Sequence, residues 1–413
     1  MTTLFTNIRQ LVGCREKWPI LRGADLANLP CIQNAFLIVE NGYIASYGAM
    51  ADLAFHVNDF SNHVDADGRM VLPAWCDSHT HLVFAGSREE EFVDKIRGLS
   101  YADIAAKGGG ILHSARKLND TTEESLFTQS LQRLKEVIQS GTGAIEIKSG
   151  YGLTVEGEIK MLRVIQRLKK AVHMPIKATF LGAHAIPSAY QENREGYINL
   201  LLNDMLPIVA KEGLADFMDV FCEKGFFTPE ETEKLCLAGK AYGLKPKLHV
   251  NQLNSIGGIE TGLKLEAISL DHLETMTPND IRLLSSAPET IGTLLPTAAF
   301  FLRMPYQPAR ELIDAGCAVS LASDFNPGSS PSGNMNFVVA LSCIQMRMLP
   351  EEAINAATLN GAHAMELADS VGSISVGKLA NLILTKPIPS LSYLPYSFGS
   401  NLVEKVMLSG QWQ

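Results

Sequence analysis

Residues 70–82 read MVLPAWCDSHTHL, a short apolar run that ends in two histidines. The i, i+2 spacing of His79 and His81 places both side chains on the same face of a strand. Seven more short apolar runs follow along the chain. They are AIEIKS (144–149), ATFLGAHA (178–185), FMDVFCE (217–223), KPKLHVN (245–251), AISLDHLE (267–274), TIGTLLP (290–296) and AVSLASD (318–324).

Amphipathic segments separate these runs. In residues 124–140 and 156–172, apolar side chains recur at the spacing of a helix with one buried face. The alternation of eight strands with helices predicts an α/β fold, a parallel (β/α)8 barrel of the TIM type. A doubly wound sheet is the alternative, but no Gly-rich phosphate-binding turn follows any of the runs.

Both ends of the chain are predicted to form β structure. Residues 35–48, AFLIVENGYIASYG, hold two apolar runs around Asn41-Gly42, a strong two-residue hairpin signal. Short apolar segments return in residues 373–385 and 401–412. Because neither end can bury a good core alone, and chain ends often lie close together, we expect one small sandwich. The predicted domains are residues 1–69 with 371–413, a composite β-sandwich, and residues 70–370, the barrel.

The composition excludes several classes of protein. Of 413 residues, 46% are hydrophobic and 19% are charged, a mix that excludes disorder as the main state. The net charge of −9 is spread without blocks of like charge, which argues against nucleic-acid or anionic-membrane partners. Seven cysteines without a C-x-x-C pair, no signal-peptide pattern and no membrane-length apolar run predict reduced thiols in a cytoplasmic protein.

Polar residues at the ends of the apolar runs are candidates for chemistry, because barrel enzymes build their sites at the carboxyl ends of the strands. His79 and His81 together can bind one divalent metal ion. Three histidines with one aspartate form a ligand set that suits Zn²⁺ or Fe²⁺ better than Mg²⁺ or Ca²⁺. Asp324 is the candidate aspartate, and His249 and His272 are candidates for the third histidine. Either of them alone also fits a hydrogen-bonded core histidine.

Glycine-containing loops follow two of the predicted strands. Residues 323–334, SDFNPGSSPSGN, are either a cluster of turns or a loop whose N–H groups and hydroxyls hold a polar ligand. Residues 148–153, KSGYGL, place Tyr151 after the second strand. Elsewhere, Gly108–Gly110 form either a mobile lid or a plain connector.

Several segments resemble the imidazolonepropionase family of the amidohydrolase superfamily, and they follow the same order along the chain. They include HTHLVFAGSREEEF (79–92), EIKSGYGL (146–153), FLGAHA (180–185), DHLE (271–274) and SDFNPGSSPSGN (323–334). The resemblance implies a metal-dependent hydrolase that opens the cyclic amide of 4-imidazolone-5-propanoate to N-formimidoyl-L-glutamate in histidine degradation. It also implies one zinc or iron ion per chain, a small anionic substrate and a homodimer.

The resemblance further assigns roles to individual residues. It implies metal ligation by His79, His81, His249 and Asp324. It implies substrate contacts for Arg88, Tyr151, His184, Asn326, Gly328 and Ser329. His272 and Asp324 are the implied catalytic proton carriers, and which of them takes the first proton stays open.

Two positions bear on how far the family pattern applies. An acidic residue is expected three positions after the fifth-strand histidine, where KLHVNQ (247–252) has Gln252. An amide cannot act as a general base, so we expect Gln252 to bind substrate. The fourth strand ends in FCEK (221–224), and strand alternation points Lys224 away from the barrel. One metal ion is therefore favoured over a pair of ions bridged by a lysine, the arrangement that the bimetallic members of the superfamily share.

Two other functions fit parts of the pattern. A ring aminohydrolase, or deaminase, would share the metal ligands, but a neutral base would not need Arg88. That arginine also fits a surface ion pair with a neighbouring glutamate, which would contribute little. A non-catalytic homologue would keep the barrel as a scaffold, but such proteins should lose metal ligands first, and all four candidates are present.

Overall fold

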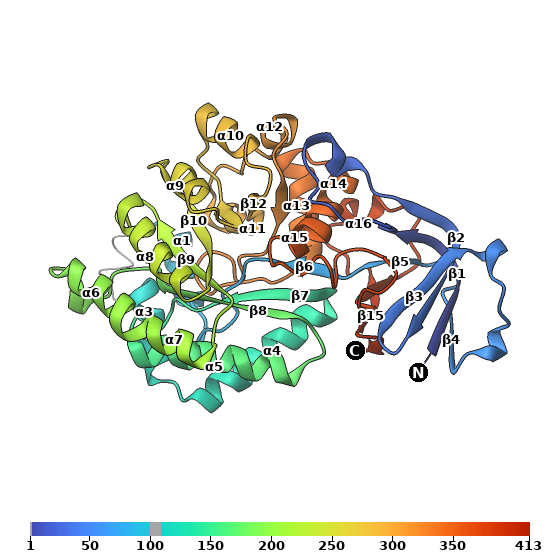
Figure 1. The fold of residues 1–413 in the computed structure, drawn as a ribbon, viewed down its shortest axis with the longest axis horizontal. Coiled ribbons are helices and arrows are strands. Elements are labelled where there is room, and N and C mark those ends of the chain that lie inside the picture. Colours follow the sequence, from blue (N-terminus) through green and yellow to red (C-terminus); the bar gives the residue numbers. More distant parts are fainter. Residues whose placement is uncertain (1, 100–108) are drawn as a thin grey trace.

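The structure is a computed structural model that describes residues 2–99 and 109–413, so Gly108 of the glycine run lies outside the described residues. Eight parallel strands form one sheet in chain order, which confirms the predicted barrel (Figure 1). They are β6 (Trp75–Asp77), β7 (Thr142–Lys148), β8 (Ile176–Ala183), β9 (Phe217–Cys222), β10 (Lys245–Val250), β11 (Ser269–His272), β12 (Ile291–Leu294) and β13 (Val319–Leu321).

The first and last barrel strands meet through the segments that follow them. Thr80 and Phe325 form a parallel bridge. The backbone N–H of His81 donates to the carbonyl oxygen of Phe325 at 2.9 Å, and that of Asp324 donates to the carbonyl oxygen of His79 at 3.0 Å. These bonds lie just beyond β6 and β13, so barrel closure itself brings His79, His81 and Asp324 together.

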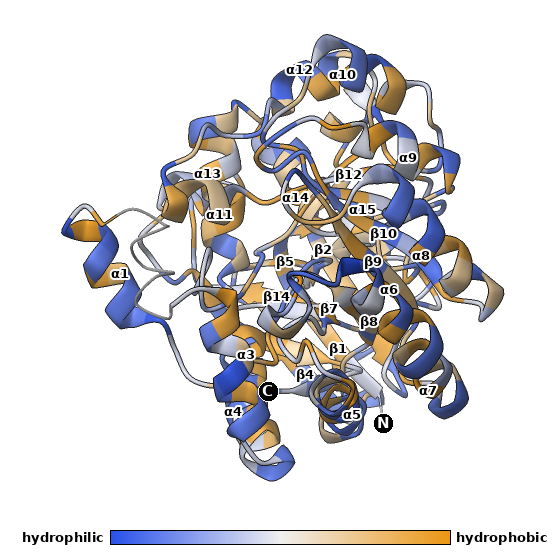
Figure 2. Cartoon of the chain, turned by 90° about the vertical axis from the view of Figure 1, so that its left-hand side faces the viewer, coloured by the Kyte–Doolittle hydropathy of each residue, from blue (hydrophilic) through white to orange (hydrophobic). Residues whose placement is uncertain are grey.

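Helices surround the barrel. The two predicted helices are α4 (Glu123–Gln139) and α5 (Val155–Ala171), and each begins at a threonine whose hydroxyl accepts an N–H of the first turn. Hydrophobic residues gather on the strands and the inner helix faces, and hydrophilic residues on the outer faces (Figure 2). The other helices are α1 (Glu89–Ile96), α3 (Ile111–Asp120), α6 (Arg194–Leu200), α7 (Leu206–Glu212), α8 (Pro229–Ala241), α9 (Gly258–Lys264), α10 (Pro278–Ser285), α11 (Pro296–Leu302), α12 (Ala309–Asp314), α13 (Met335–Met346), α14 (Pro350–Ala357), α15 (Leu359–His363) and α16 (Tyr393–Tyr396).

Both chain ends contribute to a second, separate sheet. Its strand order is β16-β15-β14-β5-β1-β2-β3, and β4 pairs with β1. The predicted hairpin at Asn41-Gly42 is confirmed, since β2 pairs antiparallel with β3 and both turn residues have positive φ. The strands are β1 (Thr2–Val12), β2 (Cys31–Glu40), β3 (Tyr43–Ala49), β4 (Asn62–Asp65), β5 (Met70–Pro73), β14 (Leu382–Thr385), β15 (Val403–Leu408) and β16 (Gln411–Trp412).

The stretch 70–82 serves both sheets. Met70–Pro73 forms β5, which pairs with β1 and β14, whereas Trp75–Asp77 forms β6 of the barrel. Between them, the N–H of Ala74 donates to the carbonyl oxygen of Asn381. The single strand expected here is therefore two strands. β5 falls within the range 70–370 predicted for the barrel but pairs with strands of the terminal sheet, and the domain limits stay a prediction.

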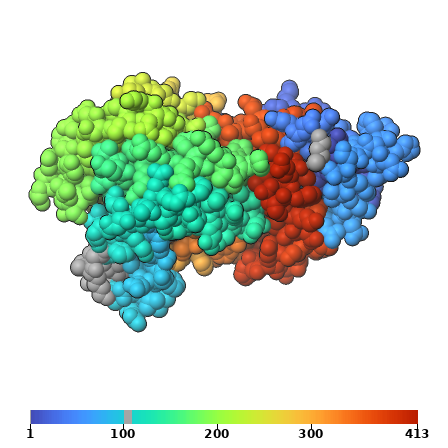
Figure 3. Space-filling view, turned by 90° about the horizontal axis from the view of Figure 1, so that it is seen from below, coloured from blue at the N-terminus to red at the C-terminus, as the bar shows by residue number. Residues whose placement is uncertain are grey.

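The C-terminal segment lies against the N-terminal strands on the surface (Figure 3). Ser409 packs closely against Gly42, where an added Cβ would lie 2.7 Å from the Ser409 carbonyl oxygen. The seven cysteines are all free thiols. No helix within residues 2–99 and 109–413 is long and apolar enough to cross a membrane.

Candidate metal centre and substrate cavity

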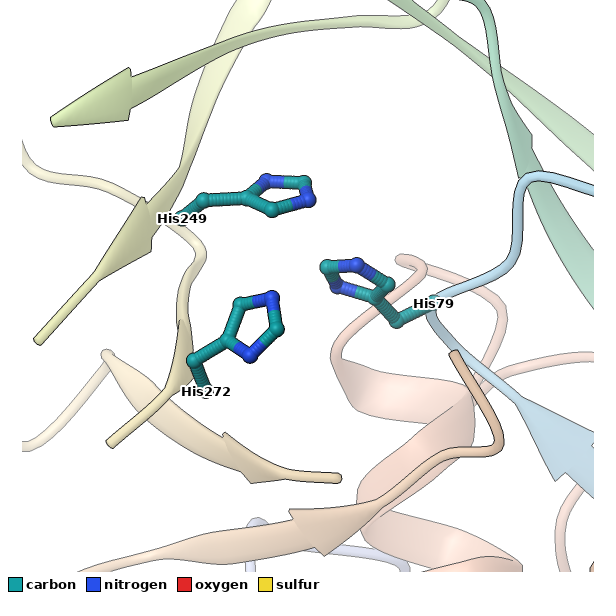
Figure 4. A group of neighbouring side chains, drawn as sticks. All are labelled: His79, His249 and His272. Carbon is teal, nitrogen blue, oxygen red and sulfur yellow. The ribbon is translucent and has the colours of Figure 1, made fainter. Parts of the chain in front are cut away.

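The structure brings together five of the predicted site residues at the carboxyl ends of the barrel strands: His79, His81, His249, His272 and Asp324. Each is at most 2% exposed. Figure 4 shows the rings of His79, His249 and His272 reaching toward one another from three separate elements. These three form one potential metal-binding group, and His79, His81 and Asp324 form a second that overlaps it.

The ring nitrogens and one carboxylate oxygen converge on a common point. Asp324 Oδ1 lies 3.6 Å from His79 Nε2 and 3.5 Å from His81 Nε2, and His81 Nε2 lies 3.4 Å from His249 Nε2. His79 Nε2 is fully buried and makes no hydrogen bond to any described residue. A buried polar atom without a partner is costly, and a metal ion would satisfy it. The cluster therefore fits a metal site.

Two carboxylates behind the cluster fix the orientation of two of these rings. Asp271 Oδ2 lies 2.6 Å from His79 Nδ1, and Asp219 Oδ2 lies 2.8 Å from His249 Nδ1. A carboxylate accepts the Nδ1 proton and leaves Nε2 free as a ligand atom, which is the usual arrangement behind metal-binding histidines. Burial holds the pKa of His79, His81 and His249 well below the ordinary value, so the neutral rings are favoured.

His272 has a different environment. Its Nδ1 lies 3.3 Å from Glu274 Oε1, which also accepts a hydrogen bond from Gln307 Nε2 at 2.9 Å. Burial alone would lower the pKa of His272, but the neighbouring Glu274 carboxylate raises that pKa above its ordinary value. Burial also raises the pKa of Asp324, to about 6. Two groups with shifted pKa values thus lie side by side, as acid–base chemistry requires.

The backbone at two of these residues is strained. His272 has φ 90° and Asp324 has φ 51°, both in the left-handed region that non-glycine residues rarely adopt. Such strain is typical of functional sites, where it aims a side chain that regular strand geometry would point elsewhere. Periodicity in the sequence contains no signal for it.

A cavity of about 720 Å³ adjoins the cluster. All seven predicted substrate residues line it: Arg88, Tyr151, His184, Gln252, Asn326, Gly328 and Ser329. Several contacts connect the residues that line the cavity to the cluster. The His184 ring stacks on His81 with centroids 5.2 Å apart, and the Ser329 hydroxyl donates to Asp324 Oδ2 at 3.1 Å.

Arg88 lines the cavity and also forms an ion pair. Its Nε and Nη2 donate to Glu91 Oε2 at 2.9 and 2.6 Å, and the other oxygen of Glu91 accepts the N–H of Gly110. The pair is largely buried, unlike the surface pair considered from the sequence. No described residue accepts a hydrogen bond from Nη1. Gly328 lies against that atom, and a Cβ there would be 2.2 Å from it, so glycine is required for this arginine position.

Residues 323–334 form a network of turns, and some of them also line the cavity. Asn326 Oδ1 accepts the N–H groups of Gly328 and Ser329, each at 2.8 Å, as in a tight turn. Asn326 Nδ2 donates to the Asp324 carbonyl oxygen and to the Ser329 hydroxyl. The turn network therefore holds Asp324 in place while its outer residues line the cavity.

Glu223 directly follows the strand β9, and its side chain supports a neighbouring loop. Its carboxylate accepts the N–H groups of Leu253 and Asn254 at 2.9 and 3.2 Å and an amide N–H of Asn254 at 3.0 Å. It therefore fixes the loop that carries Gln252. Sequence reasoning also missed Glu91, Asp219, Asp271 and Glu274. The two aspartates lie on predicted strands and Glu274 just after one, but nothing local marks them as partners of histidines.

The comparisons with known proteins agree with this geometry. The model of the amidohydrolase family matches residues 70–413. The chain is 58% identical to the imidazolonepropionase of Flavobacterium johnsoniae and 54% identical to that of Christiangramia forsetii, with all of both chains covered in each case.

Solved structures show the same fold at low sequence identity. An adenosine deaminase from Xanthomonas campestris with bound zinc is 15% identical, with a TM-score of 0.67 over 99% of this chain and 92% of that one. At that identity the likeness shows the fold alone.

Proposed function

Because the chain belongs to the amidohydrolase family, and within it to the imidazolonepropionases, we propose that it hydrolyses 4-imidazolone-5-propanoate to N-formimidoyl-L-glutamate. The observation that carries this proposal is one cavity with two kinds of chemistry. The cation of Arg88 lines it, and His184 and Ser329 of its wall contact the cluster of His79, His81, His249 and Asp324. An anionic ring substrate needs both.

We infer that these four residues hold one divalent transition metal ion, zinc or iron. Neutral imidazoles and one carboxylate suit either ion. When bound, such an ion polarises a carbonyl oxygen and makes water a stronger acid. The residues of the chain then have three tasks: to orient the substrate, to remove a proton from water and to protonate the leaving nitrogen.

The proposed reaction forms one bond and breaks one. The oxygen of water bonds to the ring carbonyl carbon, and the C–N bond of the cyclic amide breaks. His272 or Asp324 takes the proton of the attacking water, and the same pair returns a proton to the leaving ring nitrogen. The carbonyl carbon becomes the α-carboxylate of the product, and the propanoate arm becomes the glutamate side chain.

The remaining cavity residues are proposed to bind the substrate. Arg88 pairs with the propanoate through a charge-assisted hydrogen bond from Nη1, the nitrogen that the ion pair with Glu91 does not use. Gln252 meets the ring, since its amide can both donate and accept. Tyr151, His184, Asn326, Gly328 and Ser329 complete the walls. A cytoplasmic homodimer is part of the proposal, and the seven free thiols suit a reducing compartment.

A turnover assay with metal analysis tests the proposal. The purified chain should hydrolyse 4-imidazolone-5-propanoate, with about one zinc or iron ion per chain. Turnover of guanine or adenosine without hydrolysis of the imidazolone would instead support a ring aminohydrolase. A metal-loaded chain that turns over none of these would support the scaffold alternative.

Arg88→Met is expected to raise KM ten-fold or more, equivalent to about 1.4 kcal/mol of lost substrate binding, because the propanoate loses its charge-assisted partner. The measurement is steady-state kinetics with the substrate and with an imidazolone that lacks the carboxylate. Arg97→Met is the matched control. Arg88 directly precedes helix α1 and Arg97 directly follows it, but the side chain of Arg97 is exposed. Equal effects of Arg88→Met on both compounds would contradict the pairing.

Gln252→Leu is expected to lower kcat/KM by roughly 5–150-fold, because a polar group of the ring is left unpaired, at a cost of about 1–3 kcal/mol. Gln252→Glu should be milder, since the acceptor oxygen survives. Both variants keep the loop fixed by Glu223, which bonds to the neighbouring residues. An unchanged kcat/KM in the leucine variant would show that Gln252 does not contact the substrate.

A further inference from the structure

A network of five charged side chains lies in the barrel interior behind the histidine cluster. Lys148, Lys247, Glu146, Asp219 and Asp271 are all 0% exposed. They come from β7, β9, β10 and β11. Charges so fully buried are costly unless they are paired. The proposed reaction uses none of the five as an acid, a base or a substrate contact.

Lys148 is the cation that joins the network to the metal ligands. Its Nζ lies 2.8 Å from Asp219 Oδ2, 2.6 Å from Glu146 Oε1 and 3.4 Å from Asp271 Oδ2. The ammonium of one side chain thus contacts both aspartates, which belong to the different strands β9 and β11.

The same two oxygens hold the rings of the cluster. Asp219 Oδ2 also lies 2.8 Å from His249 Nδ1, and Asp271 Oδ2 lies 2.6 Å from His79 Nδ1. Each oxygen therefore contacts both the ammonium of Lys148 and the ring of one ligand histidine. Lys148 does not touch the point where the ligand atoms converge, but it is one residue away from two of the four ligands.

We propose that Lys148 is a positioning residue of the metal centre, which braces Asp219 and Asp271 so that His249 and His79 present Nε2 to the ion. The proposal rests on the metal site proposed above. Two carboxylates in a dry interior repel each other, and a cation between them opposes that repulsion. Without the ammonium, the carboxylates and the rings that they hold would move apart.

Lys247 offers a matched control. It is equally buried and belongs to the same network, where its Nζ lies 2.5 Å from Glu146 Oε2. Its other partners are the carbonyl oxygens of Ser78 and Ala364. Among the described residues it makes no ion pair with Asp219 or Asp271, although its charge acts on both carboxylates at longer range. Lys247→Met therefore removes a buried ammonium without removing a direct contact to the ring-holding carboxylates.

The test measures Zn²⁺ affinity, by competition with a chromophoric chelator, and Tm with and without Zn²⁺. In Lys148→Met we expect the affinity to fall about 10–100-fold, the usual effect of losing support behind a metal ligand. In Lys247→Met we expect a smaller fall than in Lys148→Met, because only the longer-range attraction to the two aspartates is lost. A third variant, Glu146→Gln, removes the carboxylate that contacts no histidine and leaves Lys148 in contact with both aspartates. It should lower Tm in the metal-free state, because Lys247 loses its carboxylate partner, while its affinity stays close to that of the wild type.

Three outcomes would overturn the proposal. The first is an affinity of Lys148→Met equal to wild type. The second is an equal loss in Lys247→Met. The third is an affinity loss in Glu146→Gln equal to that in Lys148→Met, which would show that the affinity follows the stability of the network alone. A wild-type chain that binds no Zn²⁺ would overturn the metal centre itself, and the role of Lys148 with it; this result differs from all three, in which the wild type binds the ion.

Discussion

His249→Ala is expected to abolish hydrolysis, with kcat/KM at least about 10³-fold lower, and to weaken metal binding. Lewis-acid chemistry is worth several kcal/mol, and this change removes one of four ligands. The ring is buried and close to both His81 and Asp219, so alanine leaves the centre open on one side and Asp219 without its imidazole. The measurements are metal content by elemental analysis, kcat/KM, and circular dichroism to show that the barrel is folded.

His173→Ala is the control for this prediction, because His173 is exposed and lies in a turn far along the chain from the cluster. It should keep both metal and activity. Full metal content and activity in His249→Ala would remove this residue from the ligand set. Two metal ions per chain in the wild type would instead contradict the single-ion centre.

The position of His79, His81, His249, His272 and Asp324 on one rim could be predicted because the rim follows from regular geometry, whereas the positive-φ backbone that aims His272 and Asp324 could not. Parallel strands of a barrel end on the same rim, so residues at the ends of the apolar runs meet there whatever their separation in the chain. The apolar runs and helical periods mark those ends in the sequence. The same reasoning places Tyr151 and His184, which follow β7 and β8, on the cavity wall.

The partners of these residues could not be predicted, because they depend on register between distant segments. His79 and Asp271 are separated by 192 positions and meet only once the barrel closes. The split of residues 70–82 into β5 and β6 has a similar cause, since the apolar pattern is continuous and only tertiary pairing decides which sheet each half joins. Three glutamates, Glu89, Glu90 and Glu91, follow Arg88 in the sequence, and the sequence alone does not say that the ion pair forms with Glu91.

His272→Asn is expected to lower kcat by about 10²–10⁴-fold, the usual contribution of a positioned acid–base group. Glu274 holds Nδ1 of this ring, so the other nitrogen is directed at the cluster, and the residue lies within reach of His79 and His249. Asparagine keeps a hydrogen-bonding group at this position but cannot titrate. The variant therefore separates proton transfer from mere orientation of the carbonyl.

The pH profile of kcat/KM shows which residue takes the first proton. A base must be unprotonated, so activity falls as the pH drops through its pKa. Burial opposes the charged ring, but the Glu274 carboxylate raises the pKa of His272 above its ordinary value, which would place the acidic limb at the higher pH. Burial raises the pKa of Asp324 to about 6, so that base would give a limb at lower pH. For the wild type we expect the higher limb, measured between about pH 5 and 9.

Two variants decide between these bases. In Glu274→Gln the amide can still bond to His272, but the charge that raises its pKa is lost, so the limb should move to lower pH while activity at high pH changes little. In His272→Asn the residual activity should lose this higher limb altogether. If both variants keep the wild-type limb, the first proton goes to Asp324. His272 would then act only as a hydrogen-bond donor to the carbonyl oxygen, and the loss in kcat would measure that single bond.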